Sequence, residues 1–328
     1  MWNVWKNDWG AICCSVFRKK YVLAWGTRIM IAAGCSVRCR WDVRFDLSQT
    51  RIFSGFPWPP MKKIIEYSYF GEILQSVLDL PAGKISTFHI EEPAGWSNIE
   101  TEAFRGHRFS SQVWRIVMDK ESSVLYYGVD FVGHPVRPPQ KEEVPTKKWM
   151  AYGSSITFGG DAHLGINAYA MRTARLLDLD LYNKSIAGSC FCDASVVEYL
   201  AKKAPQMDLV TCELGINMLR RFPEEVFKER TYHLIGRLRE AAPETKIAVI
   251  TPFTAGAAYQ KDESNEGRTR YYAFTDILKA YPDPAVTVWD GREILKDFSG
   301  LSADLVHPSD EGHAMMAMEL ANKIKKII

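Results

Sequence analysis

The stretch Tyr152-Gly153-Ser154-Ser155-Ile156-Thr157-Phe158-Gly159 follows the apolar run 149–152, which has the composition of a strand. A helical pattern begins a few residues further on, after a polar loop. A small residue, a serine and a β-branched residue at a strand end hold a hydroxyl at the edge of an open sheet, where α/β proteins bind ligands. Such a serine is a candidate nucleophile, provided that a base and an oxyanion site accompany it.

Three further groups follow in a fixed order. Gly188 lies within Ser185–Ser189, Gly215-Ile216-Asn217 follows the apolar run 209–214, and Asp304-Leu305-Val306-His307 lies near the C-terminus. Taken in this order, the four groups resemble the motifs of the SGNH (GDSL-like) hydrolases. The resemblance covers residues 147–328.

The resemblance assigns a role to each of these residues. It implies that Ser155 is the nucleophile, that His307 takes and returns its proton, and that Asp304 holds the imidazole in the useful tautomer. It assigns the oxyanion hole to the backbone N–H groups of Ser155 and Gly188 and to the side-chain amide of Asn217. This chemistry needs neither a metal ion nor a cofactor.

Two positions depart from the usual family pattern. Ser154 stands where the family usually has aspartate, and Met218 follows Asn217 where the family often has aspartate. The alignment of the motif selects Ser155 as the nucleophile and leaves Ser154 as the alternative.

Residues 147–328 alternate between strand and helix patterns, which predicts a flavodoxin-like, doubly wound parallel sheet. Asp193 is the expected N-cap of the second helix. The expected strands are 149–152, 181–183, 209–214, 246–251 and 285–290, and the expected helices are 167–177, 194–204, 223–242, 267–281 and 310–328.

Residues 41–146 show short alternating runs that predict a smaller antiparallel β-sandwich domain. The expected strands are 40–47, 84–90, 111–118 and 123–132, with a hairpin joining the last two through 119–122. Trp96 and Trp114 are expected to pack in the core or interface of this domain rather than stack on a sugar. Similar β-domains precede the hydrolase domain in some carbohydrate esterases. The proline-rich stretch 135–145 marks the boundary between the two domains.

The composition excludes some functions. A net charge of +2 gives no reason to expect a nucleic-acid partner. The sequence has no apolar run of the ~18 residues that a membrane-spanning helix needs.

The number and spacing of the cysteines indicate the cellular compartment. The odd count of seven cysteines and the absence of metal-binding spacings favour a reducing, cytoplasmic compartment. Residues 1–40 have no assigned structure. The alternative is export or lipid anchoring through Cys35.

The sequence also predicts the surroundings of several other polar residues. Glu213 ends a buried strand, where we expect a cation beside it. His163 is expected in an exposed loop, and Arg220-Arg221 at a solvated helix start.

These features together predict a serine esterase that acts on a small-molecule ester. The expected substrate carries a small acyl group, such as acetyl, on a carbohydrate. The alternatives are a lysophospholipase or thioesterase with the same machinery, and a carbohydrate-binding protein with an inactive hydrolase domain. The sequence leaves the oligomeric state open.

Overall fold

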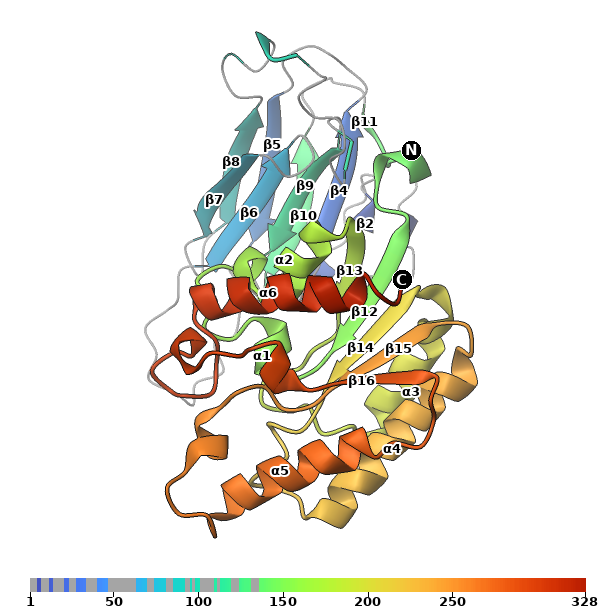
Figure 1. Cartoon of the computed structure of the whole chain (residues 1–328). Helices are drawn as coiled ribbons and strands as arrows, with labels where there is room; N and C mark the ends of the chain where they lie inside the picture. The colour runs from blue at the N-terminus through green and yellow to red at the C-terminus, as the bar shows by residue number, and fades with distance from the viewer. Residues whose placement is uncertain are drawn as a thin grey trace. The chain divides into compact units, whose positions relative to one another are not determined.

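The computed structural model describes residues 136–328 throughout and, before them, β-strands and a few short stretches (95, 98–100 and 109–110). The chain divides into two compact units, residues 1–146 and 147–328, each of which is described by itself (Figure 1). Cys35, Trp96 and the expected link 119–122 lie outside the described residues.

The described strands of the first unit all pair antiparallel, as the alternating sequence predicts. One sheet has the strand order β3-β10-β5-β8, another β11-β4-β9-β6-β7, and β1 pairs with β2. The strands are β1 (Trp5–Lys6), β2 (Ile12–Cys13), β3 (Tyr21–Leu23), β4 (Arg28–Ala33), β5 (Arg40–Asp46), β6 (Lys63–Tyr69), β7 (Leu74–Leu80), β8 (Ile85–Glu91), β9 (Val113–Met118), β10 (Val124–Asp130) and β11 (Val136–Arg137). That these sheets form a sandwich stays a prediction.

The expected hairpin between β9 and β10 is wrong. Strand β9 pairs with β4 and β6, whereas β10 pairs with β3 and β5 in a different sheet. The alternation of side chains identifies a strand and its apolar face, but it does not select the partner strand. Trp114, in β9, is 4% exposed, in agreement with the expected packing role.

The second unit is built on a five-stranded sheet with the order β13-β12-β14-β15-β16. Every pairing in it is parallel. This is the flavodoxin-like order, so the predicted fold class is confirmed for this unit. The strands are β12 (Lys147–Tyr152), β13 (Leu179–Asn183), β14 (Leu209–Glu213), β15 (Lys246–Ile250) and β16 (Val286–Trp289).

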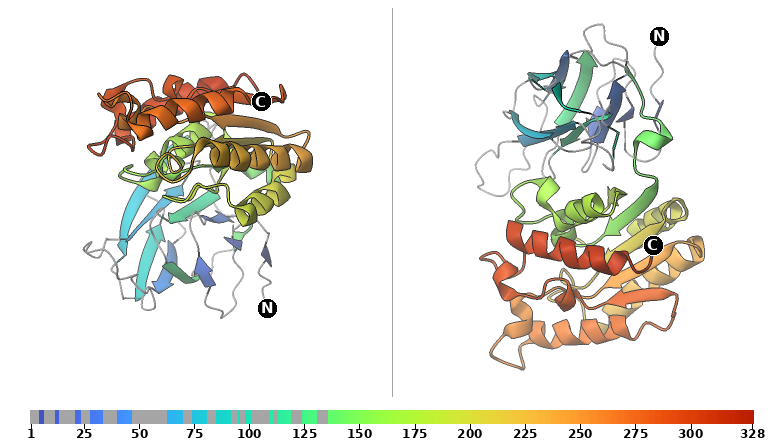
Figure 2. Two further views of the ribbon diagram at one scale, coloured as in Figure 1. Left: turned by 90° about the horizontal axis from the view of Figure 1, so that it is seen from below. Right: turned by 45° about the horizontal axis from the view of Figure 1, so that its top comes forward.

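The helices of this unit connect the strands and cover the sheet (Figures 1 and 2). Helix α2 packs beside α6, and α4 packs between α3 and α5. The helices are α1 (Ser155–Phe158), α2 (Tyr169–Leu176), α3 (Ala194–Lys203), α4 (Glu224–Ala241), α5 (Glu266–Lys279) and α6 (Asp310–Ile324). Their bounds agree closely with the expected ranges, but the short helix α1 was not anticipated.

The start of α3 differs from the expectation. Asp193 occupies the N-cap position, but its side chain makes no capping hydrogen bond. Its carboxylate instead accepts a hydrogen bond from Arg230 at 2.8 Å, because α3 packs against α4, which carries that cation. A tertiary ion pair therefore replaces the local cap.

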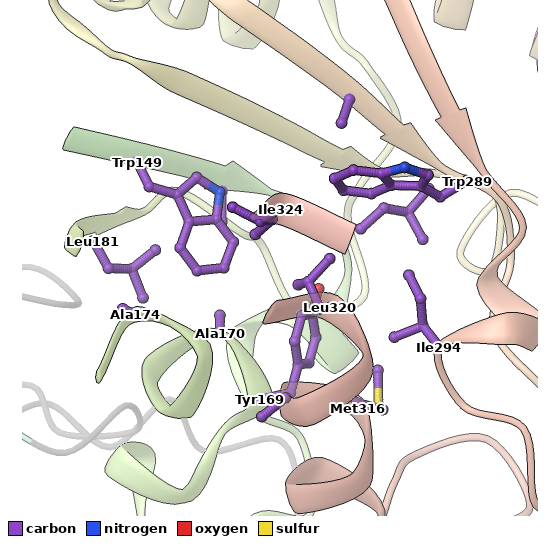
Figure 3. Packing of buried hydrophobic residues seen from close by; sticks show 14 of the residues in the cluster. Trp149, Tyr169, Ala170, Ala174, Leu181, Trp289, Ile294, Met316, Leu320 and Ile324 are labelled. Carbon is purple, nitrogen blue, oxygen red and sulfur yellow. The ribbon is translucent and has the colours of Figure 1, made fainter. Parts of the chain in front are cut away.

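One core of the second unit lies between the sheet and helices α2 and α6 (Figure 3). Trp149 of β12 is fully buried in this core, and its Nε1 donates to Thr211 Oγ1 of β14 at 2.9 Å. The other fully buried members include Ala170 and Ala174 of α2 and Leu320 and Ile324 of α6. Small residues on α2 let the two helices lie close to the sheet, and the apolar faces bury one another.

No helix among the described residues is both long and apolar enough to cross a membrane.

We predict that Leu320→Ala lowers the free energy of unfolding by about 2–5 kcal/mol, because it leaves a cavity in this core. Met318→Ala, on the same helix, is the matched control. Met318 is 57% exposed, so its truncation should change stability by about 0.5 kcal/mol or less. Urea unfolding of the three proteins measures both effects. Equal losses for the two variants would contradict this assignment of the core.

Candidate active site

The carboxyl ends of three neighbouring strands carry the expected site residues. β12 ends at Tyr152 and leads into the turn that bears Ser155. β13 leads into the loop with Gly188, and β14 into the turn with Asn217. Because the sheet is parallel and β12 lies between β13 and β14, these three connections lie at the same edge.

The structure brings Ser155, His307 and Asp304 together in one chain of hydrogen bonds. Ser155 Oγ lies 2.7 Å from His307 Nε2. His307 Nδ1 lies 2.5 Å from Asp304 Oδ2. With the ring proton on Nδ1, donated to the carboxylate, Nε2 is free to accept the serine proton.

The segment that bears Asp304 and His307 is a tight turn held by its own backbone. Leu301 and Pro308 form an antiparallel bridge, and Ser302 N–H donates to the His307 carbonyl at 2.7 Å. Inside the turn, Asp304 Oδ1 accepts the backbone N–H groups of Val306 and His307, both at 2.9 Å. The predicted fold-back of this segment is therefore present.

Hydrogen bonds keep Asp304 ionised. Partial burial of its carboxyl acts to raise the pKa, but the hydrogen bonds from the backbone and ring of His307, from Val306 N–H and from Ser302 Oγ outweigh it. The pKa of Asp304 is lowered from 3.8 to about 2. The carboxylate thus carries its negative charge at any pH at which an imidazole is neutral.

Hydrogen-bond donors that could stabilise an oxyanion lie at the same edge of the sheet. The backbone N–H groups of Ser155 and Gly188 donate to no other group within the described part of the chain. Asn217 Oδ1 accepts the N–H of Cys190 at 3.1 Å, which orients the amide and leaves its Nδ2 without an acceptor among the described residues. Gly188 has a φ of +69°, and the space where a Cβ would lie is open.

Ser154 is placed differently from Ser155. Its side chain is 1% exposed, and its Oγ accepts the N–H of Ile156 at 3.1 Å as the N-cap of α1. The hydroxyl that contacts His307 belongs to Ser155. The geometry therefore favours the register in which Ser155 is the reactive residue.

The remaining polar residues also have definite positions. His163 is exposed, as expected, and so are Arg220 and Arg221. Glu213, by contrast, is 1% exposed and has no cation beside it among the described residues. Its Oε2 accepts instead the Ser154 N–H at 2.7 Å and the Thr157 hydroxyl at 3.1 Å. The expected cation partner is therefore wrong, because neutral donors at the strand end take its place.

Three supporting residues were not identified from the sequence. Ser302 Oγ lies 2.9 Å from Asp304 Oδ1 and 2.5 Å from Asp161 Oδ2. His313, fully buried on α6, lies 3.0 Å from the Gly160 carbonyl through Nε2 and accepts Tyr169 N–H at Nδ1. Three of these four contacts span more than 140 positions of the chain and the fourth lies within a tight turn, so no local sequence pattern predicts them.

One group of described residues could hold a cation. Ligand atoms of Asp161, Asp304 and His307 lie within 4.8 Å of one another. The Asp304 and His307 side chains are also the ones that link the carboxylate to Ser155. A cation bound there would compete with that hydrogen-bonded chain.

The buried carboxyl of Glu213 gives a pH prediction. Its burial raises its pKa above the ordinary value of 4.5, against the opposing hydrogen bonds from Ser154 and Thr157. The folded chain therefore holds this proton more tightly than the unfolded chain. Its contribution to stability is full below about pH 4.5 and is lost as the pH rises towards the raised value.

We expect Glu213→Gln, which carries no such proton, to gain stability relative to the wild type as the pH rises above about 4.5. The slope for one linked proton is about 1.4 kcal/mol per pH unit. Urea unfolding between pH 4 and 8 measures the difference. A difference that is constant over this range, or that changes in the opposite direction, would contradict the assignment.

Comparison with known proteins places this geometry in a family. The family model of the GDSL-like Lipase/Acylhydrolase family matches residues 151–315, half of the 328-residue chain. A search of curated proteins finds no match.

Solved structures share the fold across most of the chain. A family two carbohydrate esterase from Cellvibrio japonicus is 14% identical with a TM-score of 0.62, over 95% of this chain and 96% of that one. The salicylyl-acyltransferase SsfX3 of a tetracycline biosynthetic pathway is 15% identical with a TM-score of 0.63, over 92% and 82%.

A GDSL-like lipase from Bacteroides ovatus is 16% identical with a TM-score of 0.61, over 92% and 84%. At these identities the likeness establishes the fold, and the family assignment rests on the matched region. The chain belongs to the GDSL-like lipase/acylhydrolase family and is a serine ester hydrolase.

Proposed function

We propose that this protein hydrolyses a small acyl ester, with acetyl on a carbohydrate as the preferred substrate, through a Ser155–His307–Asp304 triad. The observation that carries the proposal is the 2.7 Å contact between Ser155 Oγ and His307 Nε2, with Asp304 on the other ring nitrogen. Nucleophile, base and orienting carboxylate are the parts that acyl transfer requires.

The first half of the reaction forms an acyl-enzyme. Ser155 Oγ bonds to the carbonyl carbon of the ester while its proton passes to His307 Nε2. The carbonyl π electrons move onto oxygen, and the N–H groups of Ser155 and Gly188 and the Asn217 amide stabilise that charge. When the intermediate collapses, the bond to the leaving oxygen breaks, and that oxygen takes the proton from Nε2.

The second half releases the acid. Water gives its proton to His307 Nε2 and bonds to the acyl carbon, and the second tetrahedral intermediate expels Ser155 Oγ, which recovers the proton. Asp304 stays ionised throughout, because its pKa is about 2. Its charge stabilises the imidazolium that exists between the two proton transfers.

The choice of substrate is supported by the solved structures that share the fold. Besides the Cellvibrio enzyme, they include a family two carbohydrate esterase from Clostridium thermocellum, solved with cellohexaose, and an acetyl xylan esterase from Butyrivibrio proteoclasticus. Each match covers about nine-tenths or more of this chain.

We predict that Ser155→Ala lowers kcat on p-nitrophenyl acetate by about 10⁴-fold or more, because among the described residues no other hydroxyl bonds the His307 ring. Ser154→Ala is the matched control. It removes the cap of α1 and leaves the Ser155 hydroxyl in place, so it should retain measurable turnover and lose about 1 kcal/mol of stability. Loss of activity in Ser154→Ala together with full activity in Ser155→Ala would identify Ser154 as the nucleophile instead.

Substrate preference is tested by acetate release from acetylated sugars, measured against p-nitrophenyl esters of increasing acyl length. We expect kcat/KM to be highest for acetyl. A clear preference for long chains would reject the small-acyl proposal in favour of a lysophospholipase or thioesterase. Sugar binding without turnover of any ester would support an inactive binding protein instead.

We predict a large loss of kcat for Gly160→Ala, about 10²-fold. A Cβ on Gly160 would lie 2.6 Å from His307 Cδ2 and 3.1 Å from its Nε2, so the ring must leave the position in which Nε2 meets Ser155 Oγ. Gly236→Ala on α4 is the control, since its Cβ meets nothing closer than 4.0 Å. The control should keep full activity. Equal activity of both variants would show that the ring position is not critical.

A further inference from the structure

Glu213 is a buried acid that the triad leaves without a function. It is the last residue of β14, and the residue before it, Cys212, pairs with Tyr152 of β12. The carboxyl therefore lies at the sheet edge beside the turn that leads to Ser155. The side chain is 1% exposed, and no ion pair of the described residues includes it. Burying an acid without a cation beside it costs free energy, so the hydrogen bonds that this carboxyl makes are its structural role to explain.

One oxygen of Glu213 holds the turn on both sides of Ser155. Oε2 accepts the N–H of Ser154, the residue before, at 2.7 Å. It also accepts the hydroxyl of Thr157, two residues after, at 3.1 Å. Thr157 Oγ1 in turn lies 2.7 Å from the hydroxyl of Tyr169 on α2. The segment that carries the nucleophile is thus tied to β14 and to α2 through a single carboxyl group.

The approach of the carboxyl to the turn is close enough to require a glycine. A Cβ on Gly153 would lie 2.7 Å from Glu213 Oε2 and 2.4 Å from Thr157 Oγ1. Gly153 and Glu213 therefore fit together as a packed pair.

The second oxygen, Oε1, is buried and has no hydrogen-bond partner among the described residues. The titratable groups within electrostatic reach of the carboxyl are Tyr169, Cys190 and His307. The turn needs only a hydrogen-bond acceptor at the position of Oε2. The neutral side-chain amide of glutamine supplies the same acceptor.

We propose that Glu213 is a positioning residue, whose carboxyl oxygen fixes the Gly153–Ser155 turn and so sets Ser155 Oγ against His307. The inference rests on the proposed role of Ser155 as nucleophile. An interaction of this kind acts on the chemical step, because catalytic groups must be held within about 0.5 Å of their productive positions. It should act on kcat and leave KM nearly unchanged.

The test compares Glu213→Leu, which cannot accept a hydrogen bond, with Glu213→Gln, which can. With p-nitrophenyl acetate as substrate, we expect kcat of Glu213→Leu to fall by about 10²-fold with KM within about twofold of the wild type. Glu213→Gln should restore kcat to within about threefold of the wild type. Thr173→Val is the matched control. It removes a buried hydroxyl that bonds the Ala317 carbonyl at 3.3 Å, between α2 and α6, and it should keep full kcat.

A second readout separates positioning from general stability. Hydrogen exchange of a peptide covering residues 153–158 should speed up in Glu213→Leu and remain slow in Glu213→Gln and Thr173→Val. If Glu213→Leu does not fold, Thr157→Val takes its place, because it removes one of the two bonds to Oε2 and preserves the side-chain shape. We expect a several-fold lower kcat for Thr157→Val than for Thr173→Val.

Full kcat in Glu213→Leu, or in Thr157→Val where the leucine variant does not fold, would overturn the inference and leave the proposed function standing. Loss of activity in Glu213→Gln equal to that in Glu213→Leu would also overturn it, since the acceptor is then not what matters. Full activity of Ser155→Ala would reject the proposed function itself, and the hydrogen exchange of 153–158 would still report whether Glu213 holds the turn.

Discussion

The parallel pairing of β12 with β14 is the constraint on which the site depends. It sets Tyr152 opposite Cys212, so the turn after β12 and the turn after β14 leave the sheet side by side. Ser155 belongs to the first turn, and Glu213 and Asn217 to the end of the second strand and the turn after it. Trp149 and Thr211 lock the two strands with a buried hydrogen bond inside the core that α2 and α6 cover. A shift of one residue between the strands would turn the Glu213 side chain to the opposite face of the sheet and displace the turns that carry Ser155 and Asn217.

Asp304 and His307 reach the site by a different route. Their turn is closed by its own backbone bonds, and Asp304 accepts two N–H groups within it. The acid and the imidazole therefore form a local unit whose internal geometry does not depend on the sheet. The turn after β12 needs only to hold Ser155 at hydrogen-bonding distance from the His307 ring. Gly160, which has no side chain, leaves the space in which that ring lies.

Much of the second unit could be predicted from the sequence, and the reasons are physical. Buried parallel strands read as short apolar runs, and α2 to α6 carry apolar faces with helical spacing. The short helix α1 could not be predicted, because four residues are too few to show the hydrophobic periodicity of a helix. The pairing of β9 and β10 was wrong because alternation defines faces and not partners.

Prediction of the site had the same limits. Ser155, Asp304 and His307 could be placed because each follows a strand or lies in a short turn, and the motif order linked them. The environment of Glu213 could not be predicted, because its partners Ser154 and Thr157 lie more than 50 positions away and are neutral. Charge alone suggested a cation, whereas in the described residues one backbone N–H and one hydroxyl bond a single oxygen of Glu213, and burial raises its pKa.

The hydrogen bond between Cys190 N–H and Asn217 Oδ1 affects how substitutions in one loop of the site act on the other. It ties the loop that follows Gly188 to the turn that follows β14. Next to it, Phe191 and Phe222 pack edge to face at 5.5 Å, and Arg221 lies over the Phe191 ring. These contacts couple the two loops, so a displacement of one loop is transmitted to the other. A substitution that displaces either loop should therefore also tilt the Asn217 amide, so a change on one loop calls for a compensating change on the other.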